Sequence, residues 1–150
     1  MCRCFITDNK IMKTVSEQLA MFNEPDACAQ ILAYIRSGDD LSEDAQVKIF
    51  ELEEAVDIIK CLVRRYHSLC GRAQVAMMGH KDVVELVKWY TDMFSLTREA
   101  ELLMFEHEKV VELVEVYVIN NPLRDEAYSK MLKHEKAGEI IPAYLKHRTL

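Results

Sequence analysis

The chain has 150 residues, of which 50% are hydrophobic and 29% are charged, and its formal net charge at pH 7 is −6. This mixture is typical of a globular protein, and a chain of this length can bury roughly 70% of the surface that its unfolded form exposes. The negative charge disfavours nucleic acid and anionic membranes as partners. No apolar run approaches the roughly 20 residues that a membrane span requires.

The cysteines and the N-terminal segment indicate a cytoplasmic protein. The five cysteines are odd in number and lack the spacing of a disulfide framework, and the N-terminal segment has no apolar core of a signal peptide. We therefore expect a reducing compartment. Cys2 and Cys4 could supply only half of a tetrahedral metal site, so we interpret them as incidental thiols and predict neither a metal nor another cofactor.

A repeat of 27 to 28 residues organises the sequence. In all units but the first, which lacks the signature as a terminal cap would, a leucine is followed four residues later by an alanine, at Leu41/Ala45, Leu69/Ala73, Leu96/Ala100 and Leu123/Ala127. Three more columns keep this spacing: Tyr90, Tyr117 and Tyr144; His80, His107 and His134; Glu85, Glu112 and Glu139. A period in this range is typical of stacked supersecondary units. The sequence therefore predicts an all-α fold, an α-solenoid of about five stacked antiparallel helical hairpins in a single domain.

The five hairpins are predicted over about residues 11–40, 41–68, 69–95, 96–121 and 122–150. In the first, Pro25 lies in the first turn of the second helix, where proline is tolerated, and Gly38 ends that helix. Ser42 and Thr97 are good N-caps for the second and fourth hairpins. The predicted helices cover about 11–21 and 25–37, 42–51 and 53–67, 70–78 and 81–94, 97–105 and 108–120, and 122–132 and 135–147.

The last hairpin departs from the pattern. Pro142 deletes a backbone hydrogen bond inside its second helix, so we expect a kink there or a helix that starts later, after Gly138. No polar capping repeat follows, which would leave Ile140, Ile141 and Leu145 partly uncovered. A homodimer through the C-terminal hairpin is one hypothesis that follows.

The second helix of each hairpin is predicted to have a buried side and a solvent side. In a stack of hairpins the outward positions form a ridge across several repeats. We predict that a protein or peptide partner binds this ridge, whose residues are Glu85, Lys88, Asp92, Glu112, Glu115 and Glu139. Residues 96–121 carry two basic and six acidic side chains, which would suit a partner with basic groups.

Two basic clusters support an alternative function. One contains Lys60, Arg64, Arg65 and Arg72, within residues 60–72, and the other lies in residues 124–148. The simpler interpretation is that cations near helix C-termini offset the helix dipole, and a patch for phosphate or an acidic partner is the other. A nucleic-acid-binding helical repeat is therefore the alternative function, although the net charge makes nucleic acid the less favoured partner.

The repeated histidines, tyrosines and glutamates have structural interpretations. Hairpins stack about 8–10 Å apart, whereas zinc ligands lie about 2.0–2.1 Å from the metal. The three histidines therefore cannot share one ion and should cap helices at the tight turns. The tyrosines, with Tyr34 in the first unit, should pack between hairpins with their hydroxyls at polar partners, and a ladder that grips an extended ligand is the other interpretation.

No catalytic pattern is present in the sequence. The repeated glutamates belong to different units with similar surroundings, which gives no general acid and base with separated pKa values. A glycine-rich phosphate loop, a nucleophile elbow and an HExxH pair are all missing. We therefore predict that the protein is not an enzyme.

The strings MGHKDVVELVKWY and FEHEKVVELVEVY, each preceded by L-x-x-x-A, resemble tandem helical-hairpin repeats of uncharacterised bacterial proteins. The resemblance covers roughly residues 41–147. It implies an α-solenoid related in style to HEAT, armadillo and helical leucine-rich-variant repeats, and it implies a scaffold with no catalytic residues.

Overall fold

The computed structural model describes residues 13–149, which form helices, turns and loops without a strand. No helix within this range is long and apolar enough to cross a membrane. Cys2, Cys4 and the predicted helix start at residue 11 lie outside the described residues. Within 13–149 the fold is all-helical, as predicted.

The helices alternate between a short first helix and a second helix. The first helices are α2 (Val15–Met21), α4 (Glu43–Lys48), α6 (Gly71–Met77), α8 (Arg98–Leu103) and α10 (Asp125–Lys133). Short 3-10 turns, η1 (Ile49–Glu51) and η2 (Met104–Glu106), extend α4 and α8. The second helices are α3 (Ala27–Arg36), α5 (Ala55–Arg64), α7 (Val83–Tyr90), α9 (Val110–Val118) and α11 (Ala137–Leu145).

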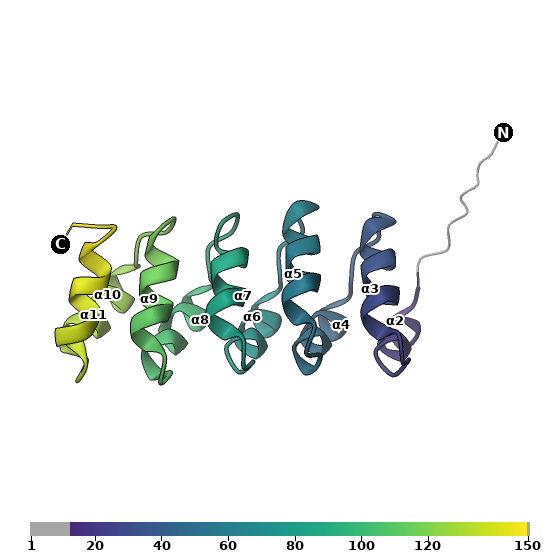
Figure 1. Cartoon of the computed structure of the whole chain (residues 1–150), viewed down its shortest axis with the longest axis horizontal. Coiled ribbons are helices and arrows are strands. Elements are labelled where there is room, and N and C mark those ends of the chain that lie inside the picture. The colour runs from purple at the N-terminus through teal and green to yellow at the C-terminus, as the bar shows by residue number, and fades with distance from the viewer. Residues whose placement is uncertain (1–12, 150) are drawn as a thin grey trace.

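The helix pairs follow one another along a row, with the chain entering at one end and leaving at the other (Figure 1). Each first helix packs on the first helices before and after it, from α2 to α10. Each second helix likewise packs on its neighbours from α3 to α11. The described chain therefore has two helical layers, and the second helices face the viewer in Figure 1.

The repeated alanines and tyrosines form the contact between the layers and the units. The four alanines of the leucine–alanine pairs are fully buried, which allows adjacent helices to approach closely: Ala45, Ala73, Ala100 and Ala127. Tyr34, Tyr90, Tyr117 and Tyr144 are also buried. The Tyr90 hydroxyl accepts a hydrogen bond from the Leu69 backbone N–H at 3.0 Å. The tyrosines are buried with their hydroxyls at polar partners, as predicted, and these partners belong to the same unit as each tyrosine.

The histidines cap the second helices. Nδ1 of His80, His107 and His134 accepts a hydrogen bond from the backbone N–H two residues later, at 2.9–3.0 Å. Nε2 of His80 lies 2.8 Å from the Leu52 carbonyl oxygen, and Nε2 of His134 lies 2.8 Å from the Phe105 carbonyl oxygen. Both carbonyls belong to the preceding unit. Because Nδ1 is the acceptor, Nε2 carries the proton and donates it. The predicted capping role is confirmed, and it also joins adjacent units.

Several boundaries differ from the predictions. The second helix predicted over 81–94 is α7, Val83–Tyr90, because the Val83 N–H bonds to the His80 carbonyl and closes a turn first. α10 begins at Asp125 rather than at residue 122, because Arg124 takes the extended N-cap conformation. The prediction that the last helix starts after Gly138 is wrong, because α11 begins at Ala137 and contains Pro142.

The apolar end predicted at the last hairpin is only partly present. Ile140 is fully buried, so its predicted exposure is wrong. Ile141 is half-buried, and Leu145 is 46% exposed. Leu132 on α10 is also 46% exposed, whereas Phe105, one repeat earlier, is only 4% exposed because the next unit covers it.

A polar side chain from each of the first four units joins successive first helices. Gln74 on α6 is 4% exposed. Its Oε1 accepts a hydrogen bond from the Thr97 backbone N–H at 2.7 Å. Its Nε2 donates to the Leu69 carbonyl at 3.1 Å and to the Tyr90 hydroxyl at 3.3 Å. Gln74 therefore supplies hydrogen-bond partners both to a backbone N–H at the start of α8 and to a backbone carbonyl in the loop before α6.

The same bridge recurs along the layer and changes at its end. Oε1 of Gln18 accepts from the Ser42 N–H, and Oε1 of Gln46 accepts from the Cys70 N–H, each at 2.7 Å. In the fourth unit a fully buried glutamate, Glu101, takes this place. We call Gln18, Gln46, Gln74 and Glu101 the amide ladder.

Glu101 joins the fourth unit to the fifth through an ion pair as well as a backbone hydrogen bond. It accepts from the Arg124 backbone N–H at 3.3 Å and from the Arg124 guanidinium at 3.1 Å. Its carboxylate also lies against the Tyr117 hydroxyl. Burial, followed by the negative charge of Glu101, raises the pKa of Tyr117 to about 12.

This pKa predicts a loss of stability in strong base. An unfolded tyrosine ionises near pH 10, whereas folded Tyr117 ionises near pH 12. Because the folded pKa is the higher one, Tyr117 contributes its full stabilisation of the fold below about pH 10. The contribution is lost as the pH rises from about 10 to 12. We expect the melting temperature to fall over this range, and to fall less steeply in Tyr117→Phe. Equal slopes for the two proteins would show that Tyr117 ionisation does not drive the loss.

Candidate functional site

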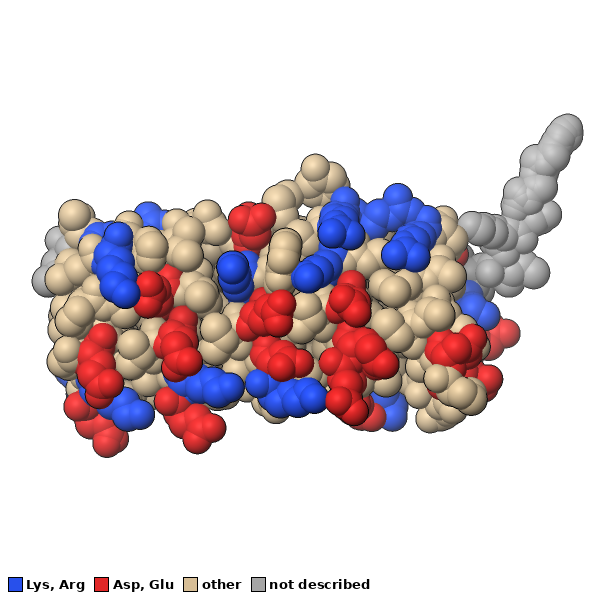
Figure 2. All heavy atoms as spheres, viewed as in Figure 1, with Lys and Arg blue, Asp and Glu red and all other residues tan. Residues whose placement is uncertain are grey.

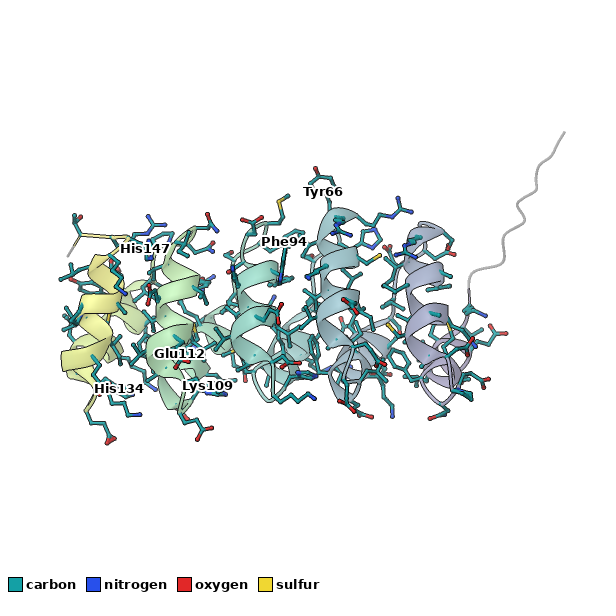
Figure 3. All side chains as sticks on the ribbon, viewed as in Figure 1. Tyr66, Phe94, Lys109, Glu112, His134 and His147 are labelled. Atoms are coloured by element: carbon teal, nitrogen blue, oxygen red, sulfur yellow. The ribbon has the colours of Figure 1, made fainter. Side chains whose placement is uncertain are left out.

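The structure places the predicted ridge along the second helices. Glu85 and Lys88 lie on α7, Asp92 follows it, Glu112 and Glu115 lie on α9, and Glu139 lies on α11. All are exposed except Glu115, which is half-buried. Glu115 bonds to Lys146 Nζ at 3.3 Å and lies 3.7 Å from His147. Glu112 and Lys109 lie near the lower end of α9 in Figure 3, and His147 lies near the upper end of α11.

Charges are used differently in the two layers. On the first helices, ion pairs join one unit to the next, as between Arg72 and Asp44 (2.6 Å) and between Arg98 and Glu126 (2.6 Å). Of the ridge residues, only Glu115 makes an ion pair within residues 13–149. Five of the six ridge charges are therefore not neutralised by a direct partner in the described fold.

The second-helix face is divided by charge. Figure 2 shows acidic atoms gathered over the lower half of this face, with several basic groups among them along the lower edge, and basic atoms gathered at the upper ends of α3 and α5. The helices begin at the lower edge and end at the upper edge, so acids lie at positive helix ends and bases at negative ones. The lower half of the face is therefore strongly acidic.

Three adjoining hollows cross this face from α5 to α9. The first, of about 600 Å³, lies between the starts of α5 and α7, and we call it the acidic hollow; its lining is Glu53, Glu54, Val56, Asp57, Lys60, Asp82 and Glu85. The second, of about 560 Å³, shares Asp82 and Glu85 with the first. It also shares Lys88, Trp89 and Val116 with the third. The hollows therefore adjoin one another across α7, and we call the three together the groove.

The third hollow, of about 240 Å³, lies between α7 and α9, and we call it the Trp89 hollow. Its lining is Lys88, Trp89, Asp92, Val116, Ile119 and Asn120. Trp89 is the only tryptophan in the sequence, and it is half-buried. Ile119 is 46% exposed. An aromatic ring and two branched aliphatic side chains thus form an open apolar pocket on a charged face.

Lys60 connects the two ends of the groove. It extends from α5, and its Nζ lies 4.6 Å from the centroid of the Trp89 ring on α7. This is a cation–π geometry. Lys60 is also the only basic residue in the lining of the acidic hollow.

The first predicted basic cluster is divided between the two layers, and several residues of both clusters are engaged. Lys60 and Arg64 lie on α5 and Arg65 follows it, with the Arg65 guanidinium bonded to the Arg36 carbonyl. Arg72 lies on α6 in the other layer. In the C-terminal cluster, Arg124, Lys130, Lys146 and Arg148 each bond to a group of the fourth unit.

Tyr66 is the strained residue at the upper edge of the second layer. It follows α5 with φ of +59°, a left-handed conformation, and the equivalent residue one unit earlier is Gly38 with φ of +95°. The His67 N–H bonds back to the Leu62 carbonyl at 3.0 Å and closes the helix end. Tyr66 is 73% exposed, and Figure 3 shows it pointing away from the stack.

We expect Tyr66→Gly to stabilise the protein by about 0.5–1 kcal/mol. A left-handed residue with a Cβ costs about 1–2 kcal/mol, and the greater freedom of glycine in the unfolded chain offsets part of that gain. Chemical denaturation would measure the change. Tyr66→Ala is the control, because alanine keeps the Cβ; an equal gain in both variants would show that the ring, and not the backbone, causes the strain.

Sequence reasoning located the ridge but not the groove. Trp89 was visible as a single tryptophan, but its contact with Lys60 requires two helices from different units. The amide ladder had a sequence signal, since Gln46, Gln74 and Glu101 each follow the alanine of the repeat. Among residues 13–149, no group of three or more His, Cys, Asp or Glu residues could hold a metal ion.

No protein-family model, no curated protein and no solved structure matches this chain.

Proposed function

We propose that this chain is an α-solenoid scaffold of five helical hairpins that binds a protein or peptide through the exposed face of its second helices. The scaffold would be non-enzymatic and cytoplasmic. The observation that carries it is the combination of unpaired ridge charges with three adjoining hollows from α5 to α9. A homodimer through the C-terminal hairpin is a separate proposal, supported by the 46% exposure of Leu132 and Leu145.

The contrast between the layers supports the choice of face. Several charges on the first helices are paired between units, as in the Arg72–Asp44 and Arg98–Glu126 pairs, and so contribute to the stack itself. Glu85, Lys88, Asp92 and Glu112 make no ion pair among the described residues. Long-range attraction from such free charges steers an oppositely charged partner and sets its orientation.

The groove supplies the apolar contact area that a charged surface lacks. Apolar contact gives most of the free energy of association, and binding energy concentrates on a few buried anchors, among which tryptophan is over-represented. Trp89, Val116 and Ile119 provide such an anchor point beside the ridge.

Nucleic acid is the weaker candidate on this geometry. The C-terminal basic residues Arg124, Lys130 and Lys146 make ion pairs with glutamates, and Arg148 donates to the Val118 carbonyl. Arg72 likewise pairs with Asp44. Phosphate contacts require free cations, so these engaged side chains favour a protein partner.

The test compares two charge-reversed variants in affinity capture from lysate of the source cell. The ridge variant carries Glu85→Lys and Glu112→Lys, and the control carries Glu99→Lys and Asp125→Lys. All four residues are exposed acids in the first turn of a helix, so both variants have the same net charge and similar helix-end effects. We expect a stoichiometric protein that the wild type and the control retain and the ridge variant loses. Loss from the control alone, or capture of nucleic acid by all three, would contradict the proposal.

A further inference from the structure

The groove has two chemically different ends, and together they define a ligand. This inference rests on the proposed function and names the chemistry of its partner. The Trp89 hollow is apolar at its base, with Val116 and Ile119 facing the ring from α9. A hollow of about 240 Å³ is large enough for one aliphatic or aromatic side chain and too small for a folded element.

The acidic hollow has an excess of negative charge. Five carboxylates line it, and Lys60 is the only cation in the lining. Glu53 is neutralised from outside by Lys81 at 3.0 Å. Glu54, Asp57 and Glu85 make no ion pair within residues 13–149. A cationic side chain placed here would meet three free carboxylates at once.

Lys60 shows that this region of the groove accepts a cation. Its ammonium group lies over the Trp89 ring while its stem lines the acidic hollow. The attraction of a ring face for a cation is worth roughly 0.5–1 kcal/mol at an exposed site. A lysine or arginine of a partner would find the same ring face and the same carboxylates, with Lys60 as its competitor.

The spacing of the helices fixes the form of the ligand. Neighbouring second helices are about 8–10 Å apart, and an extended peptide advances about 3.3 Å per residue. The acidic hollow and the Trp89 hollow lie on the two sides of α7 and are also offset along it, from Glu85 to Trp89 and Asp92. Roughly three to five residues therefore separate a side chain in one of them from a side chain in the other.

We infer that the groove across α5, α7 and α9 binds an extended peptide segment that carries an apolar residue about three to five positions from a lysine or arginine. The apolar side chain enters the Trp89 hollow, and the cation enters the acidic hollow. The charge of the groove excludes acidic segments.

The experiment selects ligands from a random dodecapeptide library displayed on phage, with the full chain as bait. Enriched peptides are then synthesised and titrated, and the emission of Trp89 reports binding because no other tryptophan is present. We expect the enriched peptides to share an apolar residue three to five positions from a lysine or arginine. We expect saturable changes in Trp89 emission.

Variants test each end of the groove. Glu54→Lys with Glu85→Lys should weaken binding at least tenfold, and Lys60→Met should tighten it at least threefold by removing the competing cation. Glu99→Lys with Asp125→Lys, which changes the net charge equally in the other layer, should leave the affinity unchanged. Circular dichroism of each variant checks that the helices are retained.

Three outcomes would overturn the inference: enrichment of acidic or uncharged peptides, unchanged affinity in Glu54→Lys/Glu85→Lys, or no enrichment. None of them decides the proposed function, which lysate capture tests separately. A partner that the ridge variant loses, without a basic segment, would leave the scaffold standing and refute the peptide chemistry. Capture with no dependence on the ridge would refute the scaffold itself.

Discussion

Gln74→Leu is expected to lower the free energy of unfolding by about 3 kcal/mol. The substitution keeps a side chain of similar size but removes the bonds to the Thr97 N–H and the Leu69 carbonyl. A buried polar group that loses its partner costs about 1–3 kcal/mol, and Gln74 is only 4% exposed. Leucine adds some apolar burial, which recovers part of the loss. Urea denaturation followed by circular dichroism would measure the difference.

Gln30→Leu is the matched control for that prediction. Gln30 is half-buried on α3, and within residues 13–149 its side chain bonds only to Asp26, four residues earlier. Its loss breaks no contact between units, so we expect a change below about 0.5 kcal/mol, which is typical of surface substitutions. Similar losses in the two variants would show that the amide ladder contributes nothing beyond an ordinary glutamine.

Arg124→Ala is expected to destabilise the protein by about 2–3 kcal/mol. Glu101 is fully buried, and the substitution removes the guanidinium that neutralises it. Breaking a buried pair by removing one partner typically costs 3–5 kcal/mol. The Arg124 side chain is 44% exposed, so water weakens the pair and reduces the loss.

The double variant Glu101→Gln/Arg124→Ala should recover most of that loss. A glutamine at this position reproduces the neutral bridge that Gln74 makes one unit earlier, and it needs no cation. Glu101→Gln alone should change stability by less than about 1 kcal/mol. The coupling energy of the double-mutant cycle, measured by urea denaturation, should be about 1.5–2 kcal/mol. A coupling energy near zero would show that Glu101 does not depend on Arg124.

The sequence was sufficient to predict the order and type of the helices because five repeated positions coincide in each of the last three units and fix the register of the others. The buried alanines, the buried tyrosines and the histidine caps were all readable as columns. The helix ends were less predictable, as α7 shows: Thr91 and Phe94 continue the helical spacing of residues, but the chain turns after Tyr90. The backbone bonds that end a helix do not appear in side-chain periodicity.

The candidate site was predictable only in part. The ridge residues share a repeat position on an amphipathic helix, so their exposure followed from spacing. The groove depends on side chains from two or three units, and the positions of Lys60 over Trp89 and of Val116 opposite Trp89 are set by the packing between helices. The charge of Glu101 could be read, but its burial and its pairing with Arg124, 23 residues later, could not.

Site-specific photocrosslinking would test the central claim most directly. The photoreactive residue p-benzoylphenylalanine replaces Lys88, which is exposed beside the Trp89 hollow, or Glu99, which is exposed on α8 in the other layer. Both proteins are irradiated in the source cell. A scaffold that binds through its second helices gives a discrete adduct from position 88 and none from position 99. An adduct from position 99 without one from position 88 would contradict the account.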